Sequence, residues 1–213
     1  MKNFIEILKN SSDKKEIEKA NKGVHSFWKG ILNMTPEDNK KFEIFILELK
    51  TFDEIKTEQN KIWFIQSLIY PMMALGKSHI KPWSEFILKN IQNPSVKIRQ
   101  AILRSADHIS IPMDLEEYRF FYDRNPSEQE FEEMEIYKQS YFKFVEDIEN
   151  LLEKYNKPEF DKYEYVSDIP PCIYKSLQYL LTEKLLRMVD TEVMYQEYLR
   201  KKNDLGSDIV EEA

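Results

Sequence analysis

Apolar residues recur along this chain at intervals of three and four positions, the period of a helix buried on one face, and almost nowhere alternate as in a strand. The pattern predicts helices that begin and end near residues 3–10, 14–33, 36–50, 53 or 57–75, 79–91, 94–109, 114–122, 126–155, 171–188 and 191–203. It therefore predicts an all-α fold of about 8–10 helices in one domain over residues 1–203, with a flexible acidic tail at 204–213.

Residues at the expected helix ends support this division. Thr35-Pro36 and Asn93-Pro94 each place a capping side chain before a proline at the first helical position. Asp190-Thr191 is a similar start for the last helix, and Gly76 is a stop signal. The chain has only 4 glycines among 213 residues, which disfavours β-rich folds and α/β folds that hold nucleotides in glycine-rich loops.

One stretch resembles a known family. Residues 93–101 read Asn-Pro-Ser-Val-Lys-Ile-Arg-Gln-Ala, and Ile98, Arg99 and Ala101 match the second helix of a HEAT repeat. The helix before it, with Trp83 and Phe86, is similar to the first helix of such a repeat. Small Ala101 would allow close helix packing, and Arg99 would reach back over the turn between the two helices.

The resemblance implies an α-solenoid, a right-handed superhelix of antiparallel helix pairs that binds a macromolecule on its concave face. The HEAT-like core would span about residues 35–111, followed by an acidic helical part over 112–203. An earlier copy over residues 36–75 lacks the Ile-Arg-x-Ala core. The repeat is therefore recognisable only near residues 79–111.

The net charge of -7 is distributed unevenly. Residues 1–110 have a net charge of +5 and residues 111–213 of -12, with the acidic excess concentrated between Asp114 and Glu164. This segment is interpreted either as a solvated face that keeps the protein in solution or as a docking surface for a basic partner.

The second interpretation gives the leading functional hypothesis, a non-enzymatic scaffold or interaction protein of HEAT-like type that binds a basic protein through its acidic face. An inhibitor or immunity-type protein that occludes the basic active site of a toxin or nuclease is one version of it. The candidate partner-binding residues are Glu128, Glu132, Glu135, Tyr118, Tyr122 and Tyr163. The three tyrosines are expected to be exposed.

Residues that would carry chemistry form no motif. The glycines are scattered, and none of the three histidines lies in a Glu-x-x-His or His-Glu-x-x-His motif. Cys172 follows two prolines near a helix start, where a thiol can be activated, but a buried structural thiol is the simpler interpretation. We therefore expect no catalytic residue, no metal and no cofactor.

Two other classes of function remain. Some HEAT-like proteins, the alkylpurine DNA glycosylases, hold damaged DNA in a basic channel, and the lysine-rich N-terminal half with three tryptophans invites the same hypothesis for DNA or RNA. The acidic second half would repel phosphate, so nucleic acid is the less favoured partner. A structural subunit that forms a homo-oligomer is the third alternative.

The cellular compartment is expected to be the cytoplasm. One cysteine allows no intramolecular disulfide. The apolar stretch near the N-terminus is too short for a signal peptide, and residues 62–75 are too short and too polar to span a membrane.

Overall fold

The computed structural model describes residues 2–29, 49–67, 80–107, 109, 111–158 and 172–208. The described residues contain nine α-helices and no strand, which confirms the all-helical prediction for this part of the chain. The α-helices are α1 (Lys2–Asn10), α2 (Lys14–Lys29), α4 (Glu58–Ser67), α6 (Ile80–Asn90), α7 (Val96–Ala106), α8 (Leu115–Tyr122), α9 (Glu128–Tyr155), α10 (Ile173–Tyr179) and α11 (Val189–Asp208). A 3₁₀ turn, Lys50–Glu54, precedes α4, and a π-helical segment, Leu180–Leu185, continues α10.

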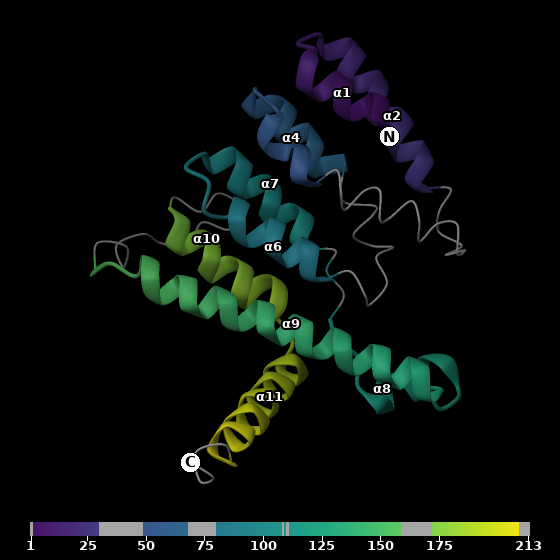
Figure 1. Cartoon of the computed structure of the whole chain (residues 1–213), viewed down its shortest axis with the longest axis vertical. Helices are drawn as coiled ribbons and strands as arrows, with labels where there is room; N and C mark the ends of the chain where they lie inside the picture. The colour runs from purple at the N-terminus through teal and green to yellow at the C-terminus, as the bar shows by residue number, and fades with distance from the viewer. Residues whose placement is uncertain are drawn as a thin grey trace.

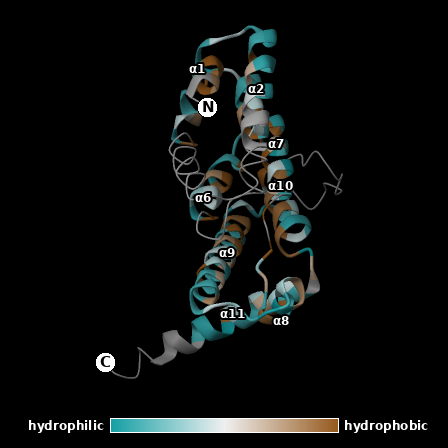
Figure 2. Ribbon diagram, turned by 90° about the vertical axis from the view of Figure 1, so that its right-hand side faces the viewer, coloured by the Kyte–Doolittle hydropathy of each residue, from teal (hydrophilic) through white to brown (hydrophobic). Residues whose placement is uncertain are grey.

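The helices stack in two layers (Figures 1 and 2). On one side α2, α4, α7 and α10 pack in succession, and on the other side α6 packs on α9. Helices α1 and α2 form a hairpin, as do α6 and α7. The links at residues 11–13 and 91–95 are short, so each helix packs antiparallel to the helix that precedes it. The α1–α2 hairpin packs on α4, which in turn packs on α7 of the second hairpin.

The core runs continuously through this stack because the helical period places each helix's apolar residues between the layers. The side chains of Ile65, Ile87, Ile102 and Val145 have no exposed surface. Phe52, from the 3₁₀ turn, packs edge-on against Phe86 with ring centroids 5.2 Å apart. The N-terminal helices thereby join the same core as α6 and α9.

Arg99 makes the polar connection that the sequence predicts. Its Nη1 donates to the backbone carbonyls of Asn93, at 2.8 Å, and Pro94, at 2.9 Å, so the side chain does reach back over the α6–α7 turn. Its Nε donates to Ser176 Oγ of α10 at 3.0 Å. Only 3% of the residue is exposed, and burial lowers the pKa of this guanidinium.

Two other polar links join neighbouring helices of the stack. The buried amide of Asn60, in α4, donates to the carbonyls of Leu8 and Ser11 at the end of α1, at 2.8 and 3.0 Å. The Tyr155 hydroxyl, at the end of α9, donates to Gln92 Oε1 in the α6–α7 turn at 2.9 Å. These bonds satisfy polar groups at helix ends that would otherwise be buried without partners.

Several expected boundaries shift in the structure. The helix predicted over 171–188 is α10 followed by π-helical Leu180–Leu185, and the Tyr141 hydroxyl donates to the Leu185 carbonyl at 2.8 Å. Helix α11 starts before Thr191, which is buried inside it, and extends five residues past the predicted end at Asn203. The predicted helix over 36–50, apart from its last two residues, and the predicted ends at Gly76 and Leu75 lie outside the described residues.

Helices α8 and α11 and the N-terminal part of α9 extend away from the stack (Figure 1). The C-terminal part of α9 packs on α6 and α10, whereas its N-terminal part projects past them and carries α8 beside it. Helix α11 crosses α9 and leads to the C-terminus. No helix within the described ranges has both the length and the apolar character needed to cross a bilayer.

Candidate functional site

The projecting end of α9 forms a helical hairpin with α8, and both helices begin with a capping box. Asp114 Oδ1 accepts from the amides of Glu116 and Glu117, each at 2.8 Å, and the Asp114 amide donates to the Glu117 carboxylate at 3.1 Å. Ser127 and Glu130 form the same arrangement at the start of α9. Such caps satisfy amides that have no partner inside a helix, so both ends of the connection are well defined.

Glu130 is the centre of the polar contacts that hold this hairpin. Its carboxylate accepts two bonds from the Arg124 guanidinium, at 2.8 and 2.6 Å, and one from the Tyr118 hydroxyl at 2.9 Å. It also accepts from the amide and hydroxyl of Ser127, each at 2.8 Å. The paired guanidinium, together with Ser127, holds the pKa of Glu130 far below its usual range.

The turn between the helices depends on Asp123, whose φ of 51° lies in the left-handed region. Aspartate tolerates this conformation better than most residues. Its amide donates to the Arg119 carbonyl at 2.9 Å and ends α8. The chain can then return along α9.

On the outside of α8 lie three large aromatic side chains that contact solvent. Phe120 is 83% exposed, Phe121 66% and Tyr122 56%. The rings of Phe120 and Phe121 pack edge to face with centroids 5.4 Å apart. We call these three residues the aromatic tip.

Phe131 and Ile136, on α9, are also exposed, at 42% and 52%. Apolar surface grouped in this way is typical of an interaction site.

The surroundings of the aromatic tip are strongly acidic. Residues 114–136, which form the hairpin, include nine carboxylates and two arginines, a net charge of -7. Both Glu128 and Glu132 are exposed, Glu135 is half-buried, and none of the three forms an ion pair with the described residues. Exposed aromatic side chains in an acidic segment fit a partner surface that is both apolar and basic.

The structure separates the six residues predicted to bind a partner. Glu128 and Glu132 lie near the start of α9, Glu135 lines a cleft further along α9, and Tyr122 belongs to the aromatic tip. Tyr118 was expected to be exposed, and this is wrong: it is 2% exposed because its ring packs under the Arg124 guanidinium and its hydroxyl binds Glu130. Tyr163 lies outside the described residues.

Sequence reasoning missed Phe120 and Phe121, which are the most exposed aromatic residues in the described part of the chain. Their signal is weak but present. In the run Tyr118 to Tyr122 four aromatic residues fall within five positions, more than one helical face can bury.

The lysines of the N-terminal half are partly neutralised. Lys9 pairs with Glu54 at 2.7 Å, Lys97 lies 3.7 Å from Glu58, and Lys89 pairs with Asp53. Trp83 is 3% exposed, which removes one of the aromatic rings that a nucleic-acid site would require. These contacts reduce the support for a basic channel.

The described side chains include no group of three or more His, Cys, Asp or Glu residues placed to hold a metal ion. Cys172 is half-buried at the start of α10. Comparison with protein-family models, with curated proteins and with solved structures finds no match. The function is therefore inferred from the geometry of this chain alone.

We expect Glu130→Gln to loosen the hairpin without unfolding the stack. The amide is uncharged and cannot reproduce the bidentate pairing with Arg124. Hydrogen exchange should show lower protection of the α8 amides at neutral pH, whereas Glu132→Gln, a matched change at an exposed position, should leave protection unchanged. Equal protection in the two variants would contradict this role.

The same carboxylate predicts a pH dependence. Because folding lowers the pKa of Glu130, its contribution to stability is complete above the usual carboxyl pKa of about 4.3 and is lost progressively as the pH falls below that value. Wild-type protection of α8 should therefore be constant from about pH 8 to pH 5 and decrease below about pH 4. Glu130→Gln should lack that decrease.

Proposed function

We propose that this chain is a non-enzymatic interaction protein, a HEAT-like helical stack that presents the α8–α9 hairpin to a basic protein partner. The observation that carries the proposal is the aromatic tip, an exposed apolar surface in a segment with a net charge of -7. An exposed phenylalanine pair is unfavourable in water, and a partner that covers it removes that cost.

The HEAT-like part of the proposal is supported by the two-layer packing of helical hairpins and by Arg99. A buried arginine that bonds the turn of its own hairpin and a helix of the next joins neighbouring units, as the repeat pattern requires. The stack then acts as a rigid base, and the hairpin is held in place by the packing of α9 on α6 and α10.

Charge favours a basic partner over a second copy of the chain. Two copies that met through their hairpins would bring together two segments that each have a net charge of -7, which is repulsive. A partner with lysines or arginines around an apolar centre would instead neutralise Glu128 and Glu132. A toxin or nuclease with a basic active site meets this description, and the chain would then act as its inhibitor.

The proposal can be tested with a defined probe, a fluorescently labelled amphipathic helical peptide of leucine and lysine. Its binding should be salt-dependent, and Phe120→Ser/Phe121→Ser should weaken it by about tenfold or more, as for the central residues of an interface. Glu128→Lys/Glu132→Lys should also weaken peptide binding, and the loss of affinity should be larger at low salt than at high salt. Fluorescence anisotropy measures both effects.

A matched control is Glu153→Lys/Glu183→Lys, which changes the net charge equally at exposed positions away from the hairpin. If this control weakens binding as much as the hairpin variants, only the total charge matters and the proposed surface is wrong. If the proposal is correct, a pull-down from the native cell should recover a basic protein with the wild type and with the control variant. It should not recover that protein with Phe120→Ser/Phe121→Ser. Retention of a labelled DNA duplex in place of the peptide would favour nucleic-acid binding.

A further inference from the structure

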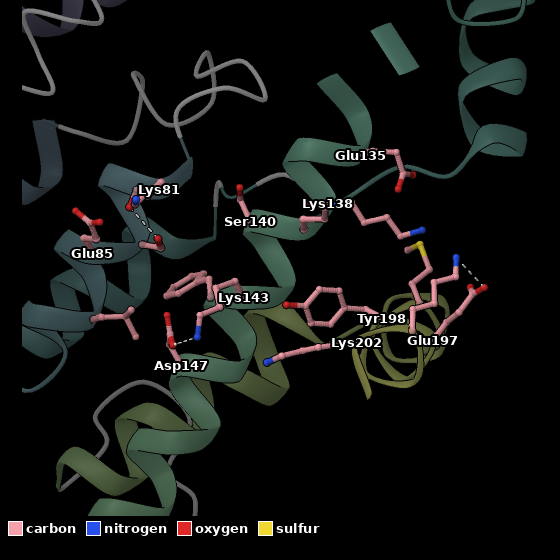
Figure 3. Close-up of a pocket in the computed structure, with 16 residues that line it drawn as sticks. Lys81, Glu85, Glu135, Lys138, Ser140, Lys143, Asp147, Glu197, Tyr198 and Lys202 are labelled. Atoms are coloured by element: carbon pink, nitrogen blue, oxygen red, sulfur yellow. Dashed lines mark hydrogen bonds and ion pairs between the residues drawn. The ribbon is translucent and has the colours of Figure 1, made fainter. Parts of the chain in front are cut away.

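A cleft lies between α6, α9 and α11, on the side of α9 where α11 crosses it (Figure 3). Its volume is about 750 Å³, within the range of cavities that hold small organic molecules. All three helices contribute walls, so the cleft exists only because α11 leaves the stack and crosses α9.

The inner surface of the cleft is apolar and partly aromatic. Leu88, Phe144, Met194 and Tyr198 line it, and Phe144 is buried at 1% exposure. The Tyr198 side chain extends from α11 toward α9 (Figure 3). Its ring is held by Phe142, with centroids 5.6 Å apart, and by parallel stacking on Tyr195 at 6.2 Å. The wall is therefore rigid enough to bind a flat ring.

The charged groups around this apolar surface include more lysines than carboxylates, unlike the C-terminal half of the chain as a whole. Five lysines and four carboxylates line the cleft, although residues 111–213 together have a net charge of -12. The lining lysines are Lys81 on α6, Lys138 and Lys143 on α9, and Lys201 and Lys202 on α11. The lining is therefore close to neutral, unlike the acidic half of the chain around it.

Three of these lysines are paired. Lys143 Nζ lies 2.7 Å from Asp147 Oδ1, Lys202 Nζ lies 2.6 Å from Glu146 Oε1, and Lys201 Nζ lies 3.4 Å from Glu197 Oε1. These pairs attach the cationic side chains to α9 and α11. The pair between Lys202 and Glu146 joins α11 to α9 directly.

Lys81 and Lys138, like the lining carboxylates Glu85 and Glu135, form no ion pair with the described residues. The two lysines stand on α6 and α9, so their ammonium groups belong to two different walls of the cleft (Figure 3). A lysine without a carboxylate partner can receive an anion without breaking an existing contact. The apolar base next to such groups fits a molecule with an apolar body and a negatively charged end.

We propose that this cleft binds a small aromatic anion, a ring system that carries a carboxylate, sulfonate or phosphate group. The ring lies against Tyr198 and Phe144, and the charged group is received by Lys138, whose side chain extends from α9 toward α11, while Lys81 adds a positive charge on the opposite side of the cleft (Figure 3). The ligand contacts α6, α9 and α11 together, so its binding also stabilises the position of α11. This site is separate from the aromatic tip and does not depend on the partner of the hairpin.

The probe for the test is 8-anilinonaphthalene-1-sulfonate, an aromatic anion whose fluorescence rises in an apolar site. The wild type should bind it saturably and more tightly than the uncharged N-phenyl-1-naphthylamine. Lys81→Glu/Lys138→Glu should weaken sulfonate binding by about tenfold, since each reversal replaces an attraction with a repulsion at a partly exposed position. The same variant should leave binding of the uncharged compound unchanged.

Two further variants separate the cleft from other surfaces. Lys50→Glu/Lys157→Glu changes the net charge equally at exposed positions outside the cleft and should bind the sulfonate like the wild type. Ser140→Trp places a bulky neutral side chain in the cleft and should weaken binding of both compounds. Circular dichroism of each variant verifies that the helices are intact.

Loss of binding in Phe120→Ser/Phe121→Ser, with full binding in Lys81→Glu/Lys138→Glu, would place the probe on the aromatic tip and overturn the proposal. Equal weakening by the two lysine double variants would also overturn it, because total charge would then suffice. No saturable binding to the wild type would have the same consequence.

Discussion

Phe142→Ala is expected to lower the free energy of unfolding by about 3–5 kcal/mol, the largest effect of any single change considered for this chain. The Phe142 side chain has no exposed surface and packs against both Tyr195 and Tyr198, with ring centroids 5.5 and 5.6 Å away. Its removal leaves a cavity at the contact of α9 with α11, and rigid neighbouring rings cannot collapse to fill it.

Urea denaturation followed by circular dichroism measures this loss. Phe120→Ala removes the same ring from a position that is 83% exposed, and should change the stability by no more than about 0.5 kcal/mol. The comparison separates burial from residue type. A similar stability loss in both variants would show that the aromatic cluster between α9 and α11 does not have the packing described here.

Arg99→Met is expected to have the second largest effect, a loss of about 3 kcal/mol. Methionine retains most of the apolar volume but donates no hydrogen bond. The carbonyls of Asn93 and Pro94 and the hydroxyl of Ser176 would all lose a charged donor in a site where water has little access. The α6–α7 turn would also lose its direct bond to α10.

Arg99→Lys should recover only part of this loss, because one ammonium group cannot span three acceptors as a planar guanidinium does. Arg104→Met provides the control, since Arg104 lies on the same helix and is exposed. Its expected effect is within about 0.5 kcal/mol. A wild-type midpoint of urea denaturation for Arg99→Met would refute the view that this side chain joins neighbouring hairpins.

Local periodicity predicts the buried faces of the helices because a residue's position on its helix follows from its place in the sequence alone. Trp83 and Phe86 lie three positions apart in the helix predicted over 79–91, and both are buried. The reach of Arg99 over its turn was also predictable, since the turn carbonyls lie five and six residues away along the chain. Its bond to Ser176, across 77 residues, was not.

The candidate site was predicted less well, because the exposure of a side chain on a projecting hairpin depends on whether another helix packs against it. Tyr118 and Tyr122 lie one helical turn apart and have the same residue type, yet one is buried and the other exposed. The difference comes from Arg124 and Glu130, which reach Tyr118 only after the chain reverses at Asp123. No periodic pattern contains that information.

By itself, the sequence determined the helical class, most of the helix ends, the inward faces and the unequal charge of the two halves, because all of these are local or additive properties of the chain. Tertiary structure alone decided that the α8–α9 hairpin projects, that Phe120 and Phe121 lie in solvent, and that α11 crosses α9 to enclose a lysine-lined cleft. These features depend on contacts between residues far apart in the sequence, whose energies appear only when the helices pack together.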